Sequence, residues 1–159
     1  MTTPLFLRAG LVLGAARTAW IVAEHLIGAR STQLEWVEPS YGIWLLVGAP
    51  ATWFFLLRAH TKSCPIAPPT LKSLAATGLG AGLISGLINA GVFWVDTTFV
   101  SPQYLDAFIA WNVENSTNTL DVANREFRLP AFLDILLVHP LATCPITAVA
   151  VSLVLPKTR

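Results

Sequence analysis

Seven polar side chains within long apolar stretches are the residues of this sequence best suited to chemistry. They are Arg17, Glu24, His25, Asn89, Asp96, Asp134 and His139. An ionisable side chain inside a membrane helix costs roughly 2.5 to 3.5 kcal/mol, so such groups usually face protein or water. Carboxylates and imidazoles gathered there can carry protons or bind a cation, with an arginine as counter-charge. We favour the alternative that they pair with one another and fix the register of the helices.

The spacing of these residues does not favour a metal site or an enzyme. Asp134 and His139 are five residues apart, and Glu24 and His25 are adjacent, so neither pair shares one side of a helix. The sequence motifs of serine hydrolases, zinc peptidases, P-loop proteins and CxxC redox proteins are absent. We therefore predict no catalytic residues, no metal and no cofactor, with a haem or pigment on His25 or His139 as a minor alternative.

Small residues at four-residue spacing predict close helix packing. They are Gly10, Gly14, Gly78, Gly82, Gly86 and Ala90. Such a row lies along one side of a helix and lets a neighbouring backbone approach closely. The large apolar residues beside this row are expected to face lipid: Leu79, Leu83, Ile84, Leu87 and Ile88.

The composition indicates an integral membrane protein with a single domain over residues 1–159. Hydrophobic residues make up 54% of the chain and charged residues 12%, and the mean hydropathy is +0.62. These values are far from those of soluble domains. The net charge of +1 gives no basic surface for nucleic acid.

The apolar stretches predict an all-α protein with four transmembrane helices, over about residues 5–28, 41–57, 73–97 and 131–155. A further amphipathic helix, over about 102–114, is expected to lie on the outer membrane surface. Pro50, Pro140 and Pro145 should bend or locally unwind their spans. The six tryptophans are mostly expected at the membrane interfaces.

Basic residues in the loop 58–72 and in the tail 156–159 place these segments in the cytoplasm, so both termini should be cytoplasmic. A weak internal repeat aligns Gly10 with Gly82 and Gly14 with Gly86 at an offset of 72 residues. We interpret it as two helical hairpins related by an axis along the membrane normal, or as chance matching of glycines.

The glycine-rich span followed by FVSPQYLDAFIAWNVEN, residues 99–115, resembles the bacterial inner-membrane proteins grouped as domain of unknown function 4199. The likeness lies in the order and style of the elements over most of the chain. The first span, with Arg17 and the Glu24-His25 pair, is more polar than that family leads us to expect. The resemblance implies a multi-pass protein of the bacterial inner membrane and brings no catalytic residues with it.

These observations favour a non-catalytic accessory or scaffold subunit that packs against other membrane protein subunits in the lipid bilayer. The alternative is a small oligomeric transporter or channel, linked to protons or cations, that uses the ionisable cluster. A homo-oligomer is possible, and a transporter or channel would need one to enclose a path. An enzyme acting on a membrane-embedded substrate ranks third.

Overall fold

The computed structural model describes residues 4–63 and 70–155, and all the regular structure in them is helical. Four helices are long and apolar enough to cross a membrane, as predicted. They are α1 (Leu5–Leu26); α2 (Val37–Ile43) continued by η2 (Trp44–Gly48) and α3 (Ala49–Ser63); α4 (Leu71–Val95) continued by η3 (Asp96–Val100); and α7 (Leu129–Val154). The second span begins earlier than predicted, because a short turn, η1 (Leu34–Trp36), leads directly into α2.

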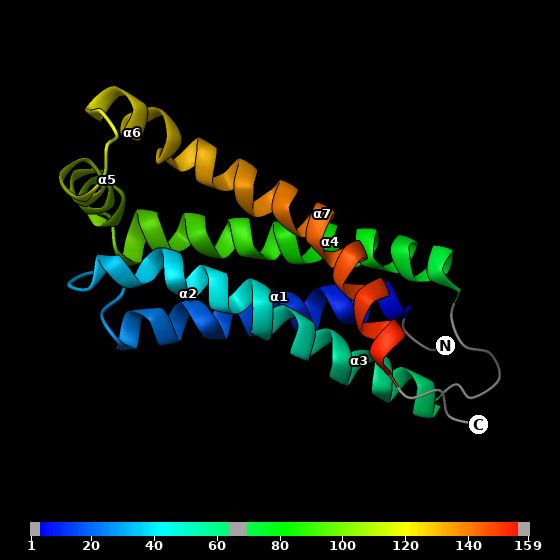
Figure 1. Ribbon diagram of the computed structural model, residues 1–159. Coiled ribbons are helices and arrows are strands. Elements are labelled where there is room, and N and C mark those ends of the chain that lie inside the picture. Colours follow the sequence, from blue (N-terminus) through cyan, green and yellow to red (C-terminus); the bar gives the residue numbers. More distant parts are fainter. Residues whose placement is uncertain (1–3, 64–69, 156–159) are drawn as a thin grey trace.

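The four spans lie side by side, and two short helices cover one end of the bundle (Figure 1). These are α5 (Tyr104–Asn115), which runs across the bundle in Figure 1, and α6 (Leu120–Glu126). The starts of α1 and α4 and the ends of α3 and α7 lie at the other end. The polypeptide therefore passes along the bundle four times, with its extra helices at one end.

The helix α5 corresponds to the amphipathic helix predicted at 102–114, but its apolar side packs on the protein. Tyr104, Phe108 and Ile109 are buried, and Tyr104 and Phe108 form a core cluster with residues of α4 and α7. The expectation of a helix resting its apolar face on the membrane is therefore wrong for these three side chains. They close the end of the bundle instead.

The predicted row of small residues lies where α4 meets its neighbours. A methyl group on Gly78 would lie 2.5 Å from Pro145 Cα, and one on Gly82 would collide with the Pro140 carbonyl. Gly86 faces the Leu136 carbonyl, which cannot accept an amide hydrogen bond from Pro140. The prolines and the glycines thus fit together, and α7 stays helical through Pro140 and Pro145 rather than unwinding.

A second small-residue contact joins α1 to α4. A methyl group on Gly10 would lie 2.6 Å from Ile84 Cβ, and one on Gly14 would lie 2.7 Å from Ile88 Cδ1. Ile84 and Ile88 therefore pack on α1, and the expectation that they face lipid is wrong. The other three members of that set, Leu79, Leu83 and Leu87, are 50 to 58% exposed on the outside of the bundle.

The glycine contacts do not support the proposed internal repeat. If α1 and α4 were equivalent, Gly10 and Gly82 would meet equivalent neighbours. Gly10 instead faces α4, and Gly82 faces α7. The matching spacing of the glycines therefore reflects two different helix contacts.

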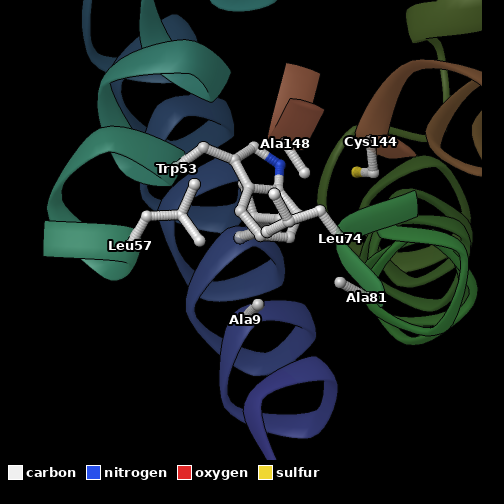
Figure 2. Close-up of a cluster of buried hydrophobic side chains, with 8 residues drawn as sticks. Ala9, Trp53, Leu57, Leu74, Ala81, Cys144 and Ala148 are labelled. Carbon is white, nitrogen blue, oxygen red and sulfur yellow. The ribbon is translucent and has the colours of Figure 1, made fainter. Parts of the chain in front are cut away.

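Trp53 forms the centre of a core cluster between the four spans (Figure 2). Its side chain is fully buried and is surrounded by residues of every span: Ala9, Leu13, Leu57, Leu74, Ala81, Cys144 and Ala148. This tryptophan is a core residue rather than an interfacial anchor. Cys144 is likewise a buried packing residue.

Candidate functional site

The candidate site begins on α1, where Arg17 and Glu24 lie two turns apart on one side of the helix. Arg17 Nη1 donates to Glu24 Oε1 at 3.1 Å. Both residues are about 95% buried, with 6% and 5% exposure. An unpaired charge at such a position would be strongly destabilising, so this pairing is what permits burial.

A tight turn after α1 brings Arg30 back into the bundle. Gly28 has φ +78°, a conformation that favours glycine. Beyond it Arg30 is buried and ion-paired with Asp96, and its Nε lies 3.5 Å from Glu24 Oε2. Arg30 is not among the site residues predicted from the sequence, and the signal that the chain turns back is the glycine two residues earlier.

Asp96 connects α1 to the end of α4. It opens η3, a π-helical turn, and its Oδ1 lies 2.7 Å from His25 Nε2. Asp96 therefore contacts both His25 and Arg30. We call the five residues joined in this way the ion network: Arg17, Glu24, His25, Arg30 and Asp96.

Hydrogen bonds from uncharged donors join α2 to the ion network. The Ser40 hydroxyl donates to Glu24 Oε1 at 2.6 Å, and Trp20 Nε1 donates to Ser40 Oγ at 2.8 Å. Ser40 is not among the site residues predicted from the sequence. Its role follows from the earlier start of the second span, which places Ser40 inside α2 and beside α1.

Aromatic rings surround both arginines. The Arg17 guanidinium lies 5.4 Å from the centre of the Tyr41 ring, and that of Arg30 lies 4.7 Å from the Tyr104 ring. Further contacts at 5.8 and 5.2 Å join Arg17 to Trp44 and Arg30 to Phe93. Burial raises the pKa of Tyr104 above its usual value, with Arg30 opposing the shift, so the phenol is neutral at physiological pH.

Two of the predicted site residues on α7 lie apart from the ion network. Asp134 is exposed, and no ion pair joins it to another described residue. His139 is also exposed; its Nδ1 lies 2.6 Å from the Tyr41 hydroxyl, and the two rings are stacked. Of the predicted ionisable residues, Arg17, Glu24, His25 and Asp96 therefore lie together in the ion network, and Asp134 and His139 do not.

Asn89 is buried on α4 and faces a small cavity. Its Oδ1 makes no hydrogen bond within the described residues, and it lines a space of about 40 Å³ together with Arg17, Ser85 and His139. A water molecule needs roughly 10 to 15 Å³ of such space. The cavity is large enough for water to donate to Asn89 Oδ1.

The charges of the ion network balance without a metal. Arg17 and Arg30 offset Glu24 and Asp96, and His25 adds a hydrogen bond or a further positive charge. Across residues 4–63 and 70–155, no three His, Cys, Asp or Glu side chains are grouped to hold a metal ion. The arrangement can hold helices together, and its carboxylates already have cationic partners.

A larger cavity, of about 220 Å³, lies beside the ion network between α2 and α7. Its polar lining residues are Arg17, Glu24, Arg30, Glu38, Tyr41 and Tyr104. No family model, curated protein or solved structure matches this chain. The resemblance to domain of unknown function 4199 therefore stays a prediction.

Proposed function

We propose that this chain is a non-catalytic accessory or scaffold subunit of a larger protein complex in the bacterial inner membrane. In this proposal the four long helices cross the bilayer, both termini are cytoplasmic, and α5 and α6 lie on the outer side. The chain contributes a rigid surface for another membrane helix. Two features support this proposal: the paired state of the buried charges and Gly91, a glycine of α4 with open space beside it.

The paired charges support a structural role for the ion network. Arginine keeps its positive charge at all physiological pH values. Glu24 receives contacts from Arg17, Arg30 and Ser40, and Asp96 receives them from Arg30 and His25. A carrier needs groups that exchange partners during transport, whereas these carboxylates are held by contacts that also join α1, α2 and α4.

Gly91 is the observation that carries the proposal of a partner helix. A methyl group on Gly91 would meet nothing within 4 Å, unlike one on Gly82. Gly91 lies on the same exposed side of α4 as Leu87 and Trp94. Glycine inside a helix costs roughly 0.5 to 1 kcal/mol relative to alanine and favours close helix contacts in membranes. We infer that a helix from another subunit packs over Gly91.

Capture of partner subunits from membranes in mild detergent tests this function. The tagged chain should recover other membrane proteins in fixed stoichiometry, identified by mass spectrometry. Gly91→Ile should release them, because the added side chain would separate the two backbones. The matched control is Ala142→Ile, which adds a similar side chain at another small, exposed position, on α7, and should leave capture unchanged.

Two results would contradict the scaffold function. One is a homo-oligomer with no heterologous partner in stoichiometric amount. The other is equal recovery of partners by the Gly91→Ile variant and the parent chain. The thermal unfolding midpoint of each variant must match that of the parent, so that loss of capture is not loss of fold.

A proton- or cation-linked transporter is the second candidate, and the position of Arg17 favours it. Arg17 lines both the cavity near Asn89 and the larger cavity, so open space approaches the ion network from two sides. In proteoliposomes this function predicts that Glu24→Gln and Asp96→Asn abolish a proton-linked flux. Asp134→Asn should then have no effect, because Asp134 is exposed and outside the network.

A further inference from the structure

Aromatic rings form much of the lining of the larger cavity. Besides Tyr41 of α2, they come from α4, α5, the residues before α7 and α7 itself: Phe93, Tyr104, Phe108, Phe127 and Phe132. Phe127 and Phe132 lie 5.2 and 6.2 Å from Phe108, centre to centre, so these rings form one continuous wall. An apolar cavity of about 150 Å³ can bind benzene. A cavity of about 220 Å³ therefore has room for a single substituted ring.

The charges that line this cavity cancel. Arg17 and Arg30 supply two positive groups, and Glu24 and Glu38 supply two negative groups. Glu38 is exposed, whereas the other three are buried, so a carboxylate stands at the mouth. An anionic lipid or fatty acid would meet this carboxylate on entry. The lining therefore favours an uncharged ligand.

Arg17 supplies unused hydrogen-bond donors to the cavity. Its Nη1 donates to Glu24, and its other guanidinium nitrogens donate to no acceptor within the described residues. Arg17 is only 6% exposed, so bulk water reaches it poorly. Guanidinium has donors and no acceptor. The group that complements it on an uncharged ligand is an acceptor such as a carbonyl oxygen.

The mouth of the cavity lies between two spans. Ile135 of α7 is 45% exposed and lines the cavity opposite Glu38 and Val37 of α2. Both helices belong to stretches apolar enough to cross a membrane. An opening between them faces the side of the bundle, where lipid would lie, and an apolar tail can leave through it.

We propose that this cavity binds the ring of an uncharged, carbonyl-bearing lipophile with an apolar tail, of the quinone class. The ring lies against Phe108, Phe127 and Phe132, its carbonyl oxygen accepts from Arg17, and its tail passes beside Ile135 into the bilayer. This site is additional to the proposed scaffold function and does not depend on it. No redox step is involved in the binding.

The test uses the full chain in nanodiscs of uncharged lipid, with three probes that share a similar tail. They are decylubiquinone, decylbenzene, which lacks the carbonyl groups, and decanoate, which is an anion. A ligand that binds the folded state raises the unfolding temperature. Decylubiquinone should raise the unfolding midpoint in a saturable manner, by about 5 °C or more. Decylbenzene and decanoate should give much smaller rises.

A substitution at the mouth locates the binding. Ile135→Trp should fold, because Ile135 is partly exposed, and should remove the rise caused by decylubiquinone by filling the cavity. Ile146→Trp is the matched control on α7, since Ile146 is 70% exposed and lies outside this cavity. It should keep the full rise.

Four results would each overturn the proposal. Decylubiquinone causes no saturable rise, decylbenzene matches it, decanoate exceeds it, or Ile135→Trp retains it. If Ile135→Trp does not fold, Arg17→Lys replaces it. Lysine keeps a positive charge beside Glu24 but has a single nitrogen, so the rise with decylubiquinone should fall toward that with decylbenzene.

Discussion

The charges of the ion network are buried only because each has a partner of opposite sign. Glu24 is the residue on which this depends most, since it contacts both Arg17 and Arg30. Ser40 adds a hydrogen bond to the same carboxylate. Removal of one buried partner leaves the other as an uncompensated charge, and this costs more than the pair itself contributes.

Glu24→Gln should therefore destabilise the protein strongly. The amide keeps the shape of the side chain and a hydrogen bond with Ser40, but it leaves two arginines with one buried carboxylate. We expect a loss of about 3 to 5 kcal/mol in the free energy of unfolding. Reversible unfolding in mixed micelles measures it.

Asp134→Asn is the control for this loss. Asp134 carries the same charge but is exposed and has no ion pair within the described residues. Its substitution should change the free energy of unfolding by less than about 0.5 kcal/mol. Similar effects of the two substitutions would show that the network does not stabilise the fold.

At the scale of the helices, some glycines lie against a neighbouring helix and others have open space beside them. Gly82 lies against the backbone of α7 at Pro140, whereas Gly91 has open space beside it. Both are interior residues of α4. The same substitution at the two positions thus distinguishes the effect of helix packing on stability from the effect of helix propensity.

Gly82→Ala should cost about 1 to 3 kcal/mol, because the methyl group would force α4 and α7 apart. Gly91→Ala should be neutral or stabilise the isolated chain by up to about 1 kcal/mol, since alanine favours the helix. Thermal unfolding of the purified variants measures both. Equal changes at Gly82 and Gly91 would contradict the packing of α4 on α7.

The sequence predicts the spans and the small-residue row well, because both depend on local spacing. It does not predict which helix packs against each side of a span. Ile84 and Ile88 have the same character as Leu83 and Leu87, and only the approach of α1 separates the pair that packs on it from the exposed pair. Spacing along one helix carries no information about the position of the next.

The site was predictable to a similar extent. Glu24 and Asp96 stand out as acids in apolar stretches, so their burial in one place follows from the cost of isolating them. Arg30 does not stand out, because it lies in a polar segment. Its place in the network depends on the turn at Gly28, and a turn of that kind is set by backbone geometry rather than by hydropathy.

At the scale of the whole molecule, the ion network, α5 and the larger cavity occupy the same end of the bundle. Tyr104 and Phe108 of α5 line that cavity, and Tyr104 also contacts Arg30. The opposite end contains the ends of α3 and α7. The two ends therefore differ in chemistry, and four crossings would place them on opposite sides of a membrane.

Labelling of one accessible cysteine at a time in intact bacterial cells with a membrane-impermeant maleimide tests this arrangement most directly. Every chain keeps Cys144, which is buried. Thr117→Cys, in the exposed turn between α5 and α6, is made in a chain with Cys64→Ser, and the parent chain supplies Cys64, in the basic stretch of sequence between α3 and α4. We predict that Thr117→Cys reacts in intact cells and that Cys64 reacts only after permeabilisation. Reaction of both, or of neither, in intact cells would contradict the four-span arrangement, and the reverse pattern would contradict the cytoplasmic location of the termini.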